Sequence, residues 1–417
     1  MTSPIRTARG SVALVNAYVV PVSAPPIERG TVLVEDGIIT VVGADVVVPA
    51  GVRTLDVAGR WVLPGFVEAH GHVGVHEEGE GWAGADVNEM TDPNGAGLRA
   101  IDAINVEEEG FRDALAGGVT SVVVKPGSGN PIGGQTVAIK TWGGRTVDEQ
   151  VISDSVSVKS ALGENPKRVY GDKKLLPSTR LGVAHVIRKA FVDAQNYAAR
   201  RDAAAAKGEP FDRDLAKETL ARVLSGELAW DQHTHRADDI ATAIRLSEEF
   251  GYRLVVNHGT EGALIADVLA EKDIPVIFGP LFTSRSKVEL RHRAIANLGR
   301  LAAAGVRVAI TTDHPVVPIN FLVHQASFAV KEGLDRDVAL QALTVNPASF
   351  LGLGERVGAL AAGLDGDVVV WSGDPLDVNS RAERVFVTGS EVYTWDAAAD
   401  GGHGAGRVVE RSERFRR

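Results

Sequence analysis

Histidines and one aspartate end several of the apolar runs in this sequence. The run WVLPGFVEAHGH ends on His70 and His72, LAWDQH on His233, YRLVVNH on His258, and VRVAITTDH carries Asp313. Alternate residues of an extended chain face the same side, so His70 and His72 point in one direction. Imidazole nitrogens together with one carboxylate suit Zn²⁺ or a similar borderline cation. These runs therefore predict a metal site.

The spacing of these residues predicts a catalytic rather than a structural metal. A structural zinc is usually enclosed by four ligands from a short stretch of chain. Here the candidate ligands spread over about 240 residues, and the chain has no cysteine, so a transition metal must bind to nitrogen and oxygen. Ligands this far apart meet only where several elements converge. We expect that place to be the mouth of a barrel.

The middle of the chain, residues 63–351, alternates strand-like runs with helical patterns. The runs lie at 119–126, 151–159, 228–233, 252–258, 274–280 and 306–314. Repeated strand-then-helix units predict a parallel sheet with crossover helices, and this length favours an α/β fold of the (β/α)8 TIM-like barrel type. A doubly wound sheet is the competitor, but no GxGxxG follows an early strand. The glycines between 127 and 134 are interpreted as a flexible loop, and Ser178 as the cap of a long helix.

Both ends of the chain are β-rich. Asp36 and Gly37 separate two Val/Ile-rich runs, which is a strong hairpin signal, and the same texture returns in GDVVVWSG and RVFVTGSEVYTW. We predict a small β-sandwich built from both ends, with residues 1–62 and 352–397 on either side of the 63–351 barrel. Residues 398–417 are predicted to be a flexible tail.

Composition excludes several classes of function. The 417 residues carry 44 basic and 54 acidic side chains, for a formal charge of -10, which argues against nucleic acid as a partner. No clean signal peptide and no run of eighteen uncharged apolar residues is present, which argues against a membrane partner. We expect a cytoplasmic protein that acts on a small molecule.

The segment VLPGFVEAHGH at 62–72 resembles the strand-one motif of the metal-dependent amidohydrolase superfamily. Nearly the whole chain is similar to the imidazolonepropionase-like and prolidase-like branch. The resemblance implies that the strand-one ligands are His70 and His72, the strand-five ligand His233, the strand-six ligand His258 and the strand-eight ligand Asp313. It also implies hydrolysis of a C–N bond by metal-activated water. Asp313 is then the proton shuttle, and His258 or His235 stabilises the oxyanion.

Lys159 falls where two-metal members carry a strand-four lysine. In those members the lysine is carboxylated, and the carbamate bridges two ions. An unmodified ammonium would repel metal, so this role requires modification. The alternative is an ion pair of Lys159 with Glu164 or another loop carboxylate. The expected cofactor is thus one or two divalent ions, with Zn²⁺ as the first candidate and other transition metals as alternatives.

The strand-five segment AWDQHTHR departs from the family pattern, because it holds two histidines. His233 matches the ligand, which leaves His235 as a candidate for catalysis and substrate contact. Arg236 could hold a substrate carboxylate as a two-pronged fork. An ion pair of Arg236 with Asp238 or Asp239 at a helix start is the alternative.

Two other functions stay open at this point. One is a single-metal deaminase or imidazolonepropionase-like enzyme. The other is a non-catalytic oligomeric scaffold that retains the barrel. For the enzyme itself, a homo-oligomer is also compatible with the sequence. The sequence does not choose among amide, cyclic amide, imidazolone and amidine substrates.

Overall fold

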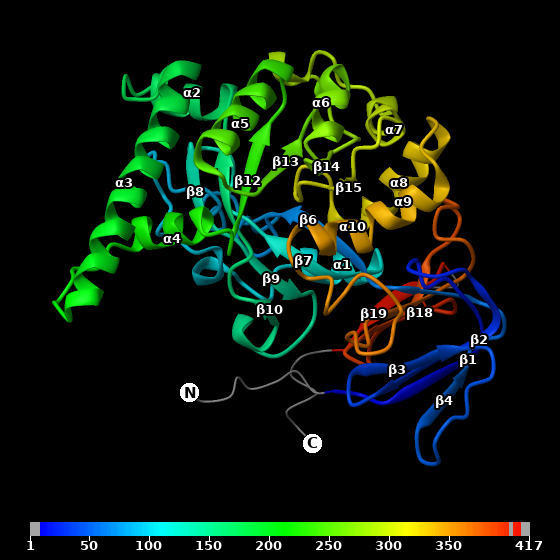
Figure 1. Cartoon of the computed structure of the whole chain (residues 1–417). Helices are drawn as coiled ribbons and strands as arrows, with labels where there is room; N and C mark the ends of the chain where they lie inside the picture. Colours follow the sequence, from blue (N-terminus) through cyan, green and yellow to red (C-terminus); the bar gives the residue numbers. More distant parts are fainter. Residues whose placement is uncertain (1–8, 400–402, 410–417) are drawn as a thin grey trace.

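The computed structural model describes residues 9–399 and 403–409 of the chain. Most helices surround the strands of the middle segment, and strands from both chain ends form a separate sheet beside them (Figure 1). None of the helices in the described residues has the length and apolar character needed to cross a membrane.

Two sheets from the middle segment surround the site. The first has the order β15-β14-β13-β12-β11-β8, in which β11 to β15 run parallel. Its strands are β8 (Ile132–Gln135), β11 (Ser157–Ala161), β12 (Ala229–Thr234), β13 (Leu254–His258), β14 (Val276–Phe278) and β15 (Val308–Ile310). The second sheet consists of β6 (Phe66–Gly71), β7 (Val119–Val124), β9 (Val137–Lys140) and β10 (Val151–Ser153).

The two sheets form two arcs of a TIM-barrel-like α/β fold. They are joined at Thr136, which alone separates β8 from β9, and the His72 amide donates to the carbonyl of His314 at 2.9 Å where β6 approaches β15. No strand pairing closes the barrel within the described residues. The predicted closed (β/α)8 barrel is therefore observed only as this open form.

The glycines after β7 explain part of the difference. Gly133 and Gly134 are buried in β8, which pairs antiparallel with β11, and Gly134 has φ 134, a conformation that favours glycine. The prediction of a flexible loop over these residues was wrong. The run at 151–159 also divides, because β10 pairs with β9 whereas β11 pairs with β12.

Helices cover the outside of the arcs (Figure 1). They are α1 (Gly110–Ala116), α2 (Glu164–Gly171), α3 (Arg180–Lys207), α4 (Leu215–Leu224), α5 (Ala237–Phe250), α6 (Ala266–Glu271), α7 (Ala296–Ala303), α8 (Leu322–Lys331), α9 (Arg336–Ala342) and α10 (Val345–Phe350). The cap of α3 is Thr179, whose hydroxyl accepts from the amide of Gly182 at 3.0 Å, and not Ser178.

Strands from both chain ends form one nine-stranded sheet. It contains β1 (Val12–Val19), β2 (Ile27–Glu35), β3 (Ile38–Gly43), β4 (Arg53–Asp56), β5 (Trp61–Pro64), β16 (Val368–Trp371), β17 (Ala382–Val387), β18 (Ser390–Asp396) and β19 (Ala405–Val408). The hairpin at Asp36 and Gly37 is confirmed, with φ of 48 and 80. Because these strands belong to one sheet, the sandwich stays a prediction.

The predicted tail at 398–417 contains an ordered strand. Residues Ala405–Val408 form β19, which pairs antiparallel with β18 and places Val408 opposite Tyr393. The indole of Trp142 also donates to the carbonyl of Val409 at 3.2 Å. These contacts correct the prediction for this segment, while 400–402 and 410–417 lie outside the described residues.

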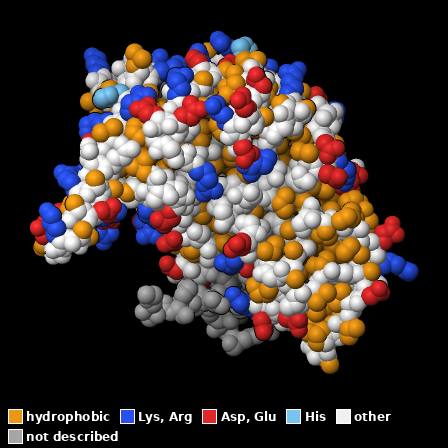
Figure 2. Space-filling model, viewed as in Figure 1, with side chains coloured by type: hydrophobic (Ala, Val, Ile, Leu, Met, Phe, Trp, Pro, Cys, Tyr) orange, Lys and Arg blue, Asp and Glu red, His pale blue; other side chains and the backbone are white. Residues whose placement is uncertain are grey.

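Acidic and basic side chains are mixed over the face seen in Figure 2, and hydrophobic side chains gather at its lower right, over the nine-stranded sheet. This face carries no large basic patch, in agreement with the charge of -10. Electrostatics on this face thus gives no support for a nucleic-acid partner.

Candidate active site

Strand periodicity points several polar side chains into the barrel. In β12, Ala229 packs in the inner apolar cluster and Trp230 in the outer one. Residues two apart share a face, so Asp231 and His233 follow Ala229 toward the inside. Both are buried, although buried polar groups are costly without partners. The interior of the barrel is thus apolar at one end and polar at the other.

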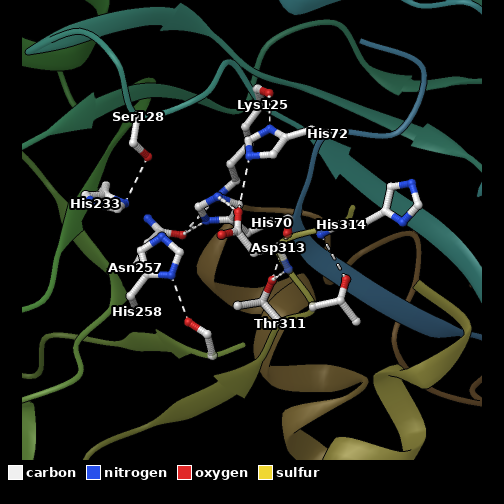
Figure 3. Close-up of polar contacts among 12 residues, drawn as sticks. His70, His72, Lys125, Ser128, His233, Asn257, His258, Thr311, Asp313 and His314 are labelled. Carbon is white, nitrogen blue, oxygen red and sulfur yellow. Dashed lines mark hydrogen bonds and ion pairs between the residues drawn. The ribbon is translucent and has the colours of Figure 1, made fainter. Parts of the chain in front are cut away.

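Two candidate residues leave their strands with unusual backbone conformations. His258 ends β13 with φ 68 and Asp313 follows β15 with φ 53, which are left-handed values for residues with a side chain. Such conformations cost of order 1 kcal/mol and occur often at functional sites. Here they accompany side chains that turn to the same centre, as Figure 3 shows.

Three histidines direct Nε2 toward this centre, while Nδ1 of each ring is hydrogen-bonded on the other side. Each Nδ1 faces an oxygen that can only accept a hydrogen bond: His70 faces Asn257 Oδ1 at 2.7 Å, His72 the carbonyl of Lys125 at 2.7 Å, and His258 the carbonyl of Gly279 at 2.8 Å (Figure 3). Each Nδ1 therefore carries the proton, and in the neutral ring each Nε2 offers a lone pair. His258 Nε2 is buried without a hydrogen-bond partner.

Asp313 completes this centre. Its Oδ1 lies 3.1 Å from His70 Nε2 and 3.2 Å from His72 Nε2, and possible ligand atoms of His70, His258 and Asp313 lie within 4.8 Å of one another. Burial holds the pKa of His70 well below its usual value, so its Nε2 is not protonated near neutral pH. Lone pairs facing a carboxylate oxygen need a cation between them. The donor set therefore fits a divalent metal ion.

His233 lies beside this centre and shares contacts with Lys159. Its ring is 4.5 Å from that of His258, and its Nδ1 is 2.9 Å from Ser128 Oγ. The ammonium of Lys159 also donates to Ser128 Oγ, at 2.8 Å. The strand-four and strand-five candidates thus meet at one hydroxyl, next to the first three histidines.

Lys159 has no carboxylate within ion-pair distance among the described residues. Its second contact is the carbonyl of Pro126 at 3.3 Å, so the pairing with Glu164 that the sequence left open is not observed. Burial lowers the pKa of Lys159 to about 8, with Asp313 and Asp231 opposing the shift. Roughly a tenth of Lys159 is then a neutral amine at pH 7.

A buried charged network supports His70 from behind. Lys125 and Asp231 form an ion pair that is inaccessible to solvent, and Asn257 contacts both of them. Asn257 Oδ1 accepts from Lys125 Nζ at 3.2 Å and from His70 Nδ1. The network therefore fixes which end of the amide faces the histidine.

These residues open into a cavity of about 510 Å³. His72, His233, His235, His258 and Asp313 line it. Lys287 lies in the same wall, with Nζ 3.1 Å from Asn165 Oδ1 and 3.4 Å from His235 Nε2. The Nδ1 of His235 is 2.8 Å from Thr260 Oγ1, so both nitrogens of this ring have a partner.

Arg236 does not line this cavity. Its guanidinium forms a two-pronged ion pair with Asp238 at 2.8 and 2.7 Å, at the start of α5. The hydrogen bonds to Asp238 raise the pKa of Arg236 further. The local ion pair, which the sequence left as the alternative, is observed, and the prediction of Arg236 as a substrate contact is corrected.

Sequence reasoning missed Lys287, Asn165 and Ser128. All three come from segments outside the strands, so no strand periodicity marks them. It also missed Lys125, although a lysine directly after the wholly buried strand β7 is a signal of a functional or paired charge.

Comparisons with known proteins agree with this geometry. The amidohydrolase from Thermotoga maritima MSB8 is 45% identical in sequence, with a TM-score of 0.89 over 91% of this chain and 99% of that protein. The chain belongs to the amidohydrolase family. The sequence profile of the Amidohydrolase family matches residues 199–393.

Two curated relatives extend this family assignment. Imidazolonepropionase of Mesorhizobium japonicum is 26% identical over 403 residues, which is 87% of this chain and 90% of the relative. Amidohydrolase tasK of Hapsidospora irregularis is 29% identical over 398 residues, but this chain spans only 40% of its length.

These matches confirm the predicted amidohydrolase superfamily, the similarity to imidazolonepropionases, and the enzyme class, a hydrolase acting on C–N bonds. The non-catalytic scaffold is not supported.

Proposed function

We propose that this amidohydrolase cleaves an amide, a cyclic amide or a related C–N bond of a small molecule with the help of bound divalent cations, Zn²⁺ first. Its ligands are His70, His72, His233, His258 and Asp313, with Lys159 joining them as a carbamate. The observation that carries the proposal is the convergence of Nε2 atoms and a carboxylate oxygen, which repel one another unless a cation lies between them.

A divalent ion, when bound, lowers the pKa of water toward about 7 and polarises a carbonyl oxygen. Asp313 accepts the proton of the attacking water, whose oxygen bonds to the carbonyl carbon. When the C–N bond breaks, Asp313 returns that proton to the leaving nitrogen. The pKa of Asp313 lies well below its usual value although burial opposes the shift, so Asp313 is a carboxylate near neutral pH.

The sequence named His258 and His235 as residues that stabilise negative charge developing on the carbonyl oxygen, a role that needs a donor facing the cavity. His258 donates its Nδ1–H to the carbonyl of Gly279, so this role is proposed for His235, while His258 is proposed as a metal ligand. Both line the cavity, and their rings stack with centroids 4.9 Å apart.

Three further predictions from the sequence stay part of this proposal. They are a cytoplasmic location, the β-sandwich, and domain boundaries at 62, 351 and 397.

Metal content and hydrolysis test the proposal together. Elemental analysis of the purified protein should find one or two equivalents of a divalent metal, zinc first. Removal of the metal by a chelator should abolish hydrolysis of any active member of a panel of amides and cyclic amides, and re-addition should restore it. A metal-free preparation that hydrolyses such a substrate at the full rate would contradict the proposal.

A further inference from the structure

Glu68 is a carboxylate of the motif VLPGFVEAHGH that lies two residues before His70 and is inaccessible to solvent. No basic side chain among the described residues forms an ion pair with it. Its Oε1 accepts from the amide of His70 at 3.0 Å, and its Oε2 accepts from the amide of Thr312 at 2.8 Å and from the hydroxyl of Thr312 at 2.6 Å. A buried carboxylate is costly unless its oxygens are hydrogen-bonded, and these three bonds meet that need.

These bonds join two segments that strand pairing leaves apart. His70 belongs to β6 and Thr312 follows β15, and no ladder links β6 with β15 in the part of the chain that the structure describes. The pairing of β6 with β7 is also irregular between Glu68 and Gly71, so it does not hold His70 in register. Glu68 thus binds both arcs of the barrel, one with each carboxylate oxygen.

Thr311 connects the same two segments a second time. Its hydroxyl donates to the carbonyl of His70 at 2.7 Å and accepts from the amide of Asp313 at 3.0 Å. The backbone of His70 and that of Asp313 are therefore held by one small network of buried side chains. Asp313 has φ 53 in this network, and a left-handed backbone of this kind persists only where the surrounding contacts hold it.

An amide cannot replace the carboxylate of Glu68. Each of its oxygens faces a backbone N–H, which can only donate. The hydroxyl of Thr312 accepts from the amide of His314 at 3.2 Å and directs its own proton to Glu68. Glutamine has the same shape, but its NH2 group would meet a donor in either orientation. Glu68→Gln therefore breaks the network while it changes the packing very little.

We propose that Glu68 is a positioning residue for the hydrolysis, which holds His70 and Asp313 at the spacing that the metal ion and the attacking water require. This inference rests on the proposed function, because it assumes that His70 binds the metal and that Asp313 takes the proton. Glu68 does not line the cavity, so it acts through the backbone of its two partners and does not contact the reacting atoms.

Glu68→Gln and Glu68→Asp test this inference together. On a substrate that the parent hydrolyses, Glu68→Gln should lower kcat about tenfold or more with KM changed less than about twofold, and it should weaken zinc binding about tenfold in competition with a chromogenic chelator. Glu68→Asp keeps a carboxylate and should recover a large part of both. A merely structural role would lower the midpoint of urea unfolding but leave kcat of the folded, metal-loaded protein unchanged.

Asp367→Asn is the matched control. Asp367 is also a buried carboxylate, accepts from the amide of Thr388 at 2.9 Å and from Lys140 Nζ at 2.7 Å, and does not line the cavity. This variant should lower stability without changing kcat or zinc affinity. If Glu68→Gln does not fold, Thr312→Val takes its place, because it removes only the hydroxyl donor and should lower kcat several-fold.

Kinetics and zinc affinity equal to those of the parent in Glu68→Gln, or losses no larger than those of Asp367→Asn, would overturn the inference. The proposed function would survive that result, because metal content and hydrolysis of the parent are measured separately.

A parent without metal or hydrolysis would instead contradict the proposed function. Amide hydrogen exchange of the metal-free protein, measured by mass spectrometry, then still tests the contact between the two segments. Glu68→Gln should exchange about tenfold faster than the parent in peptides that cover residues 66–72 and in those that cover 308–316. Unchanged protection in either segment would overturn the inference.

Discussion

Asn257 accepts a hydrogen bond from His70 Nδ1 at 2.7 Å and thereby sets the tautomer of that histidine. Its amide cannot turn over, because Lys125 can only donate to its oxygen and Asp231 can only accept from its nitrogen. The buried ion pair of Lys125 and Asp231 therefore acts on the metal centre through one amide. Outer contacts of this kind typically change metal affinity 10- to 100-fold.

Asn257→Leu should accordingly weaken metal binding by roughly tenfold or more while the protein stays folded. Competition with a chromogenic chelator measures the affinity. Asn346→Leu is the control, because its amide donates to the carbonyl of Val308 at 2.9 Å and contacts no histidine. Equal affinities in both variants would show that Asn257 does not position His70.

Removal of both strand-one histidines should empty the site without unfolding the chain. The double variant His70→Ala and His72→Ala loses two lone pairs beside Asp313 but little apolar packing. Elemental analysis should find little metal, and circular dichroism should be unchanged. His185→Ala, on the outer side of α3, should retain the metal. Full occupancy in the double variant would refute the ligand assignment.

Asp313→Asn keeps the shape of the side chain but removes the base. We expect turnover of an identified substrate to fall by about a hundredfold or more, chiefly in kcat. Metal content is measured on the same sample, so that loss of the ion can be separated from loss of the base. Activity within a few fold of the parent would move the role of base to another residue, with His235 the first to test.

The candidate ligands were predictable because the strand period and the strand ends alone decide where they lie. His70, His233 and His258 follow this rule, and the structure brings them together. Lys287 was not predictable in the same way. It lies in a loop after β14, and only the packing of that loop over the cavity gives its ammonium neutral partners.

Two of the errors have different physical causes, one local and one tertiary. Asp238 follows Arg236 by two residues, and its carboxylate accepts two hydrogen bonds from the guanidinium. These donors of Arg236 are therefore not available to a substrate. The division of 151–159 into β10 and β11, by contrast, depends on pairing with β9 and β12, which lie far apart in sequence. Register of that kind is decided by tertiary contacts rather than by local pattern.

The metal-free protein should lose stability as the pH falls below the unfolded pKa of histidine. Burial lowers the pKa of His258 from 6.5 to about 4, so the unfolded chain binds a proton between these values and the folded protein does not. The contribution of neutral His258 to the free energy of unfolding is then fully present above pH 6.5. It decreases toward pH 4, and about 2 kcal/mol of it is lost at pH 5. The low pKa of Asp313 acts at lower pH, below 3.8.

Urea unfolding of the metal-free protein at pH 7 and pH 5 measures this dependence. His258→Asn should show a shallower decrease between the two values. A parent protein equally stable at both would contradict the buried neutral histidines on which the metal site depends.

Whether Lys159 is carboxylated determines whether the site binds two metal ions or one. A carbamate forms when a neutral amine adds to carbon dioxide and releases a proton. With a pKa of about 8, roughly a tenth of Lys159 is neutral at pH 7, compared with roughly one part in three thousand for a lysine at its ordinary pKa of 10.5. Burial thus prepares this lysine for the modification, which replaces a repelled ammonium by two oxygen ligands.

Lys159→Ala should lose one equivalent of metal, and short carboxylic acids should partly restore it. Protein grown or incubated with ¹³C-bicarbonate should show a carbamate resonance that is absent from this variant and that strengthens from pH 6.5 to 8.5. Lys167→Ala is the control, since Lys167 is exposed on α2. A single fully occupied metal in both the parent and Lys159→Ala, with no carbamate resonance, would refute the bridge and favour the single-metal, imidazolonepropionase-like mechanism.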